Sequence, residues 1–199
     1  AYTGYDRVML YRFDAEWNGE VLAESRAEHL EPLEGHHYPA SDIPRQAREL
    51  FLKNWIRIIP DVRYTPSELA PVHNPLTGQP TDLTPSILRN VSPIHIQYLK
   101  NMNVAASLTI SVIINGTLWG MIACHHTAPK FVSYNTRKEC EVLGKLFSHH
   151  ISVTEQKNTD RYTTQLVALE KEIHHDMLRS FSITAGMESD DRRLLELTG

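Results

Sequence analysis

Residues 107–126, SLTISVIINGTLWGMIACHH, restrict the fold of this chain more than any other segment. Two runs rich in β-branched residues flank Asn115 and Gly116, a dipeptide that favours a tight β-hairpin because both positions accept a positive φ. The first run alternates hydroxyl residues on one face with apolar residues on the other: Ser107, Thr109 and Ser111 against Leu108, Ile110 and Val112. The pattern predicts an antiparallel sheet, and the simplest expectation for its polar face is solvent exposure.

Two more strands and a helix are predicted upstream of the hairpin. Residues 6–14 and 19–25 are short apolar-rich runs on either side of a turn-like segment, which is typical of two antiparallel strands. Residues 41–55, SDIPRQARELFLKNW, indicate a helix for which Ser41 or Asp42 is the expected N-cap. The apolar positions of this helix are Ala47, Leu50, Phe51 and Ile56.

A long loop and a second short helix are expected next. Residues 60–85 are rich in Pro, Thr, Asn and Asp without periodicity, and loops of that length inside a domain tend to be functional. In residues 92–104, SPIHIQYLKNMNV, Ser92 can cap a helix and Pro93 suits its first position. This helix carries a histidine, a tyrosine and a methionine where a plain apolar stripe would otherwise lie, which raises the question of a binding role.

The C-terminal quarter predicts one long helix. Residues 135–183 contain no proline and one glycine, so a single helix of 49 residues is possible. Its two apolar stripes, separated by a polar stretch, suggest contact first with the preceding domain and then with a second body or a partner copy: Cys140, Leu143, Phe147 and Ile151; Tyr162, Leu166, Leu169, Ile173 and Met177. The overall expectation is an α+β fold, a central antiparallel sheet flanked by helices and followed by this helix.

Composition excludes several classes of function. A formal charge of -4 without a long basic run gives no electrostatic basis for nucleic-acid binding. No apolar run approaches the roughly 20 residues that a membrane span needs. The two cysteines, Cys124 and Cys140, lack disulfide or metal spacing, which favours a reducing, cytoplasmic location.

No motif of enzyme or metal chemistry is evident. Eight of the eleven histidines form adjacent pairs, but neighbours in a strand or helix point in different directions and cannot share a metal ion. A G-x-S-x-G elbow, a Walker loop and a G-x-G-x-x-G turn are all missing from the sequence. We therefore expect neither catalytic residues nor a metal site.

The remaining polar residues suit a large, planar, partly charged small molecule. Aromatic and imidazole side chains supply stacking and hydrogen bonds, and arginines bind carboxylates: Tyr11, Tyr38, Tyr98, His95 and His125, with Arg57 and Arg89. Each has a simpler alternative, because Asp42 can be only a helix cap, the arginines surface ion pairs and the histidines structural core residues.

Three motifs resemble the chromophore-binding GAF domain of phytochromes, especially the bacterial and cyanobacterial type. They are YPASDIPRQAREL, LRNVSPIHIQYLKNMNV and the hairpin sequence, in this order and separation. The resemblance implies a GAF bilin-binding domain over residues 1–152, truncated at its N-terminus. Residues 153–199 would then be the connecting helix and the beginning of a PHY domain, and the loop at 60–85 would be the segment through which an N-terminal strand threads in these receptors.

The resemblance also implies a set of site residues. The DIP motif would supply the Asp42 backbone carbonyl, with His95, to a water between the pyrrole nitrogens, while Ile43 and the adjoining Pro44 lie beneath the rings. Propionate ligands would be Arg57, Arg89, Ser92, Ser107 and Thr109. The D-ring surroundings would be Tyr11, Tyr38, Phe51, Tyr98, Met102 and His125, with Phe51 where a tyrosine is frequent and Asn103 where a glycine is frequent.

One departure bears on how the chromophore is held. In many relatives the residue before the histidine of the second helix is the cysteine that forms a thioether with the bilin, and here it is Ile94. The resemblance therefore implies non-covalent binding within this chain, of biliverdin first and phycocyanobilin second.

The functional hypothesis is a photoreceptor fragment that senses red and far-red light and signals through its long helix, possessing no enzymatic activity of its own. Alternatives are a light-insensitive GAF module for dimerisation or interaction and a GAF domain that binds a cyclic nucleotide. A homodimer through the long helix is expected, since two apolar stripes would otherwise lack a partner.

Overall fold

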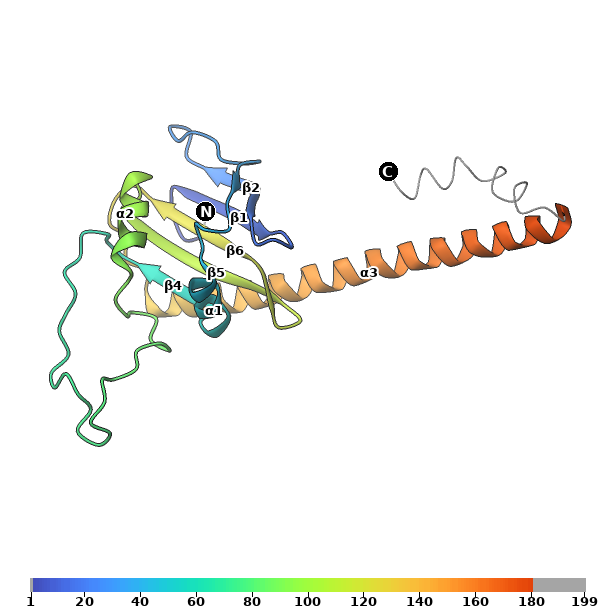
Figure 1. Ribbon diagram of the computed structural model, residues 1–199. Coiled ribbons are helices and arrows are strands. Elements are labelled where there is room, and N and C mark those ends of the chain that lie inside the picture. Colours follow the sequence, from blue (N-terminus) through green and yellow to red (C-terminus); the bar gives the residue numbers. More distant parts are fainter. Residues whose placement is uncertain (1, 181–199) are drawn as a thin grey trace. The chain divides into compact units, whose positions relative to one another are not determined.

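The computed structural model describes residues 2–180, which form a six-stranded antiparallel sheet and three helices (Figure 1). The strand order is β3-β2-β1-β6-β5-β4. The strands are β1 (Arg7–Phe13), β2 (Gly19–Arg26), β3 (His37–Tyr38), β4 (Ile56–Ile59), β5 (Ala106–Ile114) and β6 (Thr117–His126). The helices are α1 (Arg45–Lys53), α2 (Pro93–Asn101) and α3 (Tyr134–Ser180). The predicted α+β fold with a long helix is confirmed.

The hairpin at the centre of the sheet forms as its sequence predicts. Ile114 of β5 pairs with Thr117 of β6, and the two residues between them have φ angles of 49° at Asn115 and 78° at Gly116. Positive φ at both central positions matches the right-handed twist of the flanking strands. The predicted pair β1 and β2 is also antiparallel, and the segment between β4 and α2 runs as an open loop in Figure 1.

The prediction for residues 41–56 is wrong at both ends. The helix α1 begins at Arg45 with Pro44 as N-cap and has no side-chain cap, so neither Ser41 nor Asp42 caps it. The predicted helical position Ile56 lies in β4, an edge strand of four residues that pairs with β5. A strand of four residues is too short to show a clear alternating pattern in the sequence, so Ile56 happened to continue the apolar pattern of the preceding helix.

Both faces of the sheet are buried at β5, which corrects the expectation of a solvent-exposed polar face. The exposed fraction of Ser107 is 4%, that of Thr109 is 9% and that of Ser111 is 0%. The Ser111 hydroxyl donates to the Phe51 carbonyl at 2.8 Å and so ties α1 to β5. The hydroxyl face therefore lies beneath α1 and neighbouring segments, where its polar groups need partners other than water.

The opposite face packs against α3 and the segments that flank the sheet. Its buried cluster spans six separate segments of the chain: Tyr5, Ile56, Ile58, Ala106, Leu108, Ile110, Cys124, Val132 and Cys140. Alternation along β5 thus sends one set of side chains toward α3 and the other toward α1.

The helix α3 approaches the sheet through small residues. A Cβ on Gly144 would lie 2.5 Å from Cγ2 of Ile110, closer than atoms can pack. The Ser148 hydroxyl, one turn further on, donates to the Gly144 carbonyl and accepts the Ile113 N–H at 3.1 Å. Leu143, predicted to face the domain, is 53% exposed. The buried stripe therefore runs through Cys140, Gly144 and Ser148, and the predicted apolar stripe is wrong at Leu143.

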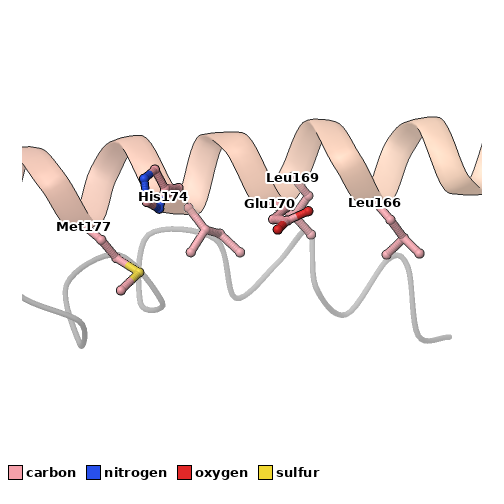
Figure 2. A pocket seen from close by; sticks show the side chains of 6 residues that line it. Leu166, Leu169, Glu170, His174 and Met177 are labelled. Carbon is pink, nitrogen blue, oxygen red and sulfur yellow. The ribbon is translucent and has the colours of Figure 1, made fainter.

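The chain divides into two compact units, 1–150 and 151–199, and α3 continues across the division. In the second unit, Leu166, Leu169 and Met177 project from the same side of α3 (Figure 2). The predicted helix end at Ile183, and the part of the expected PHY domain after residue 180, lie outside the described residues. None of the helices in residues 2–180 combines the length and apolar character needed to cross a membrane.

The close contact at Gly144 predicts that Gly144→Ala destabilises the protein. Helix propensity alone favours alanine by about 1 kcal/mol, whereas overpacking against the buried Ile110 costs about 1–3 kcal/mol. The net loss should be measurable as a lower urea midpoint without a change in slope. His149→Ala, at an exposed position of the same helix, is the control and should change the midpoint little. A Gly144→Ala variant that is more stable than the wild type would contradict this packing.

Candidate ligand-binding site

Five of the predicted site residues lie on the hydroxyl face of the sheet. Strand register places Arg57 opposite Thr109 and Ser107 opposite His125, and residues paired in this way project to the same side. Tyr11 reaches this face from β1, and its ring occupies the space above Gly19. A Cβ on Gly19 would lie 1.7 Å from the Tyr11 hydroxyl oxygen, so glycine is required there for this orientation of the ring.

Helix α2 contributes an imidazole and a phenol in parallel orientation. The rings of His95 and Tyr98 are 6.2 Å apart between centroids with an interplanar angle of 14°. The helix rests on an apolar cluster that Met102 and Tyr98 partly cover: Ile59, Val62, Val91, Leu99 and Val104. After α2, Asn103 has a φ of 56°, a left-handed conformation that asparagine tolerates well at a helix end. Pro93 is at the first position of α2 as predicted, but Ser92 makes no side-chain cap.

The segment before α1 brings Tyr38 and Asp42 to the same place. The Tyr11 and Tyr38 rings lie 6.0 Å apart. Burial raises the pKa of Tyr11, Tyr38 and Tyr98, that of Tyr98 to about 12, and the nearby Asp42 carboxylate raises each of them further. Asp42 therefore lies among three tyrosines that come from three different elements.

Arg48 holds the DIP turn in place. Its guanidinium donates to the Ile43 carbonyl at 2.7 Å and lies 4.6 Å from the centre of the Trp17 ring. Ile43 packs into the apolar cluster beneath this turn together with Phe51. Two contacts on one guanidinium thus fix the orientation of the backbone next to Asp42.

A second group combines two arginines with a histidine. Burial lowers the pKa of Arg57, and the neighbouring Arg89 lowers it further. Burial, and then the charge of Arg57, lower the pKa of His95 to about 4. Neither arginine forms an ion pair within residues 2–180, although the Arg89 guanidinium donates to the Ser86 carbonyl at 2.9 Å. Two adjacent cations without a carboxylate form a site suited to a dianion.

His125 completes the hydroxyl face of the sheet. Burial, and then the charges of Arg7 and His95, lower its pKa to about 4. Its buried Nδ1 atom has no hydrogen-bond partner among the described residues. An unsatisfied buried nitrogen is costly, so its presence indicates a place that a ligand can fill.

Four other predicted site residues lie in the core or at the surface of the protein. Phe51 is a buried core residue, and the Arg57 guanidinium lies 5.9 Å from the centre of its ring. Pro44, Ser92 and Ile94 are exposed, with 83% of the Ile94 surface accessible. The residue before His95 is thus an apolar side chain in solvent.

Sequence reasoning missed Arg7, Glu24 and Arg48. Arg7 lies on the same face of β1 as Tyr11, and a charged residue at a core-facing strand position is the signal that could have identified it. Arg48 offers no comparable signal, because an arginine on an amphipathic helix is ordinarily a surface residue. Within the described residues no three His, Cys, Asp or Glu side chains converge as a metal site would require.

Comparison with known proteins gives a consistent family. The GAF domain family matches residues 1–154. Cyanobacterial phytochrome B of Nostoc sp. is 48% identical over 180 residues, which cover 90% of this chain and 23% of that protein. The bacteriophytochrome of Pseudomonas aeruginosa is 51% identical over 154 residues, covering 77% of this chain and 21% of its own length. The chain thus spans about a quarter of the curated relatives that it matches.

Solved structures agree with the sequence comparison. The crystal structure of a bacteriophytochrome from the photosynthetic bacterium R. palustris matches with a TM-score of 0.89 at 40% identity, covering 98% of this chain and 39% of that one. The chromophore-binding domain of Stigmatella aurantiaca phytochrome P1 matches with a TM-score of 0.69 at 51% identity, covering 74% of this chain and 48% of that one.

The two depressed histidine pKa values predict a pH dependence of stability. Between pH 6.5 and about 4 the unfolded chain binds more protons than the folded one, so stability falls as the pH is lowered through this window. Each histidine contributes at most about 1.4 kcal/mol per pH unit. Urea unfolding at pH 7, 6 and 5 should show this loss, and His95→Gln and His125→Gln should each flatten it. An equally steep dependence in the double variant would contradict the assignment.

Proposed function

The chain belongs to the GAF domain family and is homologous to the cyanobacterial and bacterial phytochromes, and on this premise we propose that it binds a linear tetrapyrrole at the candidate site. In this proposal the chain is the light-sensing part of a larger receptor of the cytoplasm and has no enzymatic activity of its own. The bilin, once bound, supplies absorption of red light and isomerisation about a methine bridge.

The observation that carries this proposal is the coexistence of unpaired polar groups on one side of the sheet. Arg57 and Arg89 lie side by side without a carboxylate, and the Nδ1 atom of His125 is buried without a partner. A bilin carries two propionates on its central rings and a carbonyl on each terminal ring. The residues present therefore fit the group in charge and in hydrogen-bonding capacity.

Each side chain then has a defined role. The two arginines bind the propionates, assisted by hydroxyls of Ser92, Ser107 and Thr109. His95 and the Asp42 carbonyl hold the pyrrole nitrogens, over an apolar surface that includes Ile43, Pro44 and Ile94. A hydrogen bond from His125 fixes the D-ring carbonyl within a wall of five residues: Tyr11, Tyr38, Phe51, Tyr98 and Met102.

The positions of the thiols support non-covalent binding within this chain. Cys124 is 1% exposed, Cys140 is 2% exposed, and both lie in the cluster on the α3 face of the sheet. Burial raises the pKa of Cys124 to about 12, so its reactive thiolate is not populated near neutral pH. The apolar Ile94 at the start of α2 supplies no substitute. Biliverdin is the proposed pigment, with phycocyanobilin as the second choice.

The helix α3 is the proposed output element. It contacts the opposite face of the same sheet through Gly144 and Ser148, so a change at β5 is transmitted directly to the helix. Residues from 153 onward are proposed to lead into a PHY domain.

Addition of biliverdin to the purified protein tests the proposed ligand. We expect a sharpened, red-shifted absorption band and release of the pigment on denaturation. Arg57→Met and Arg89→Met should each weaken binding about tenfold or more, because charge-assisted hydrogen bonds contribute about 1.5–3 kcal/mol. Arg45→Met, at an exposed arginine on α1, is the matched control.

Three results of this titration would contradict the proposal. A free-pigment spectrum with the wild-type protein would reject bilin binding and favour a light-insensitive interaction module. Displacement of biliverdin by a cyclic nucleotide would instead place a different ligand at the site. Unchanged binding by His95→Ala and Arg89→Ala would reject the residue assignments.

We also propose a homodimer formed through α3. The side of this helix that faces away from the sheet carries apolar residues in solvent, with exposed fractions of 56% at Val142, 53% at Leu143 and 60% at Leu146. A second copy of the same surface would bury them in an isologous contact.

Sedimentation at high protein concentration checks the dimer. The wild-type chain should sediment as a dimer, and Leu143→Glu/Leu146→Glu as a monomer, because burying two carboxylates at the contact is unfavourable. Leu88→Glu, at a leucine of similar exposure in the loop before α2, should remain dimeric. A monomeric wild type would contradict the proposal.

A further inference from the structure

A buried ion pair that the sequence did not predict lies at the edge of the candidate site. The Arg7 guanidinium on β1 pairs with the Glu24 carboxylate on β2, and the exposed fractions of the two side chains are 10% and 3%. Ion pairs within a protein are costly to desolvate, so one that persists usually has further hydrogen bonds that compensate its charges.

These hydrogen bonds attach the loop between β2 and β3 to the sheet. Arg7 donates to the Glu31 carbonyl at 2.7 Å, and the Leu33 N–H donates to the Glu24 carboxylate at 2.9 Å. Leu33 in turn packs into the apolar cluster that contains Tyr11 and Tyr38. The ion pair thus anchors the loop that leads into β3 and the DIP turn.

The same guanidinium faces His125. Arg7 and His125 are directly paired residues of neighbouring strands, so their side chains lie side by side on the hydroxyl face. The other groups around His125 are His95 from α2, whose charge also acts on it, and Ser107, its partner on β5. Glu24 lies behind Arg7 as seen from His125, and Tyr38 on β3 is the other titratable group that the charge of Arg7 affects.

We propose that the Arg7–Glu24 ion pair is a positioning element of the bilin site, which fixes the β2–β3 loop and, through its guanidinium, adds to the burial that keeps the imidazole of His125 uncharged. An uncharged imidazole retains both a donor and an acceptor nitrogen, so a ligand carbonyl meets a hydrogen-bond donor that carries no charge of its own. Glu24 compensates the charge of the guanidinium on the side away from His125, so that Arg7 can remain buried beside the imidazole. The inference rests on the proposed function, but the geometry that carries it involves residues of this chain alone.

NMR titration of the protein without pigment provides the test. The chain is labelled with ¹⁵N-histidine, and His125→Gln identifies the signal of His125. The main variant is Arg7→Met/Glu24→Gln, which removes both charges and leaves no buried charge unpaired. We expect it to raise the titration midpoint of His125 by about one pH unit, since a nearby like charge lowers a histidine pKa by about that amount or more.

Two further variants separate electrostatics from folding. Arg7→Lys keeps the positive charge and loses the planar fork, so it should leave the midpoint near that of the wild type. Arg12→Met/Glu20→Gln removes an exposed ion pair between the same two strands and should also leave it unchanged. A purely structural ion pair would lower the stability of the main variant without moving the midpoint.

A folded Arg7→Met/Glu24→Gln protein in which His125 titrates as in the wild type would overturn the inference. Failure of biliverdin to bind the wild-type protein would reject the proposed ligand, but it would not affect this titration, which uses no pigment. The two proposals can therefore fail independently.

Discussion

The close packing of α3 on the central sheet is the constraint on which the rest of the first unit depends. Gly144 leaves so little space above Ile110 that the helix lies directly on β5, and the apolar side chains of β4, β5 and β6 are buried beneath it. Since alternate residues of a strand project to opposite faces, the remaining side chains must point toward α1 and α2. Hydroxyl, imidazole and guanidinium groups thereby come to lie in a protein interior, where they form a site.

That site retains polar groups that the protein itself does not satisfy. The unpartnered Nδ1 of His125 and the adjacent Arg57 and Arg89 cost folding free energy in the unliganded chain, because buried polar groups lose their water. Proteins tolerate such costs where a ligand recovers them. The bilin proposal accounts for all three groups with one molecule, whereas separate explanations as a structural histidine and surface ion pairs leave the His125 nitrogen without a hydrogen-bond partner and the two arginines without a carboxylate.

Prediction from the sequence succeeded where the signal was local. The Asn115-Gly116 turn and the β1–β2 pair depend on the conformational preferences of a few adjacent residues. Prediction was wrong where a distant contact decided the outcome. The residue Ile56 joins β4 because β5 offers an edge to pair with, and Leu143 is exposed because the smaller Gly144 lets the helix approach the sheet on its own side.

The amino-acid sequence alone was enough to identify the residue types that could meet a planar anionic ligand and, through three motifs in order, the family of the fold. The proximity of Arg57 to Arg89, the position of Asp42 among three tyrosines and the approach of the Arg7–Glu24 pair to His125 became known from the folded structure. Apart from Asp42 and Tyr38, which are four positions apart, those relations join residues between 17 and 118 positions apart in the chain. Spacing along a strand or helix reports on neighbours within one element, and it carries no information about which elements the sheet register and the helix packing bring together.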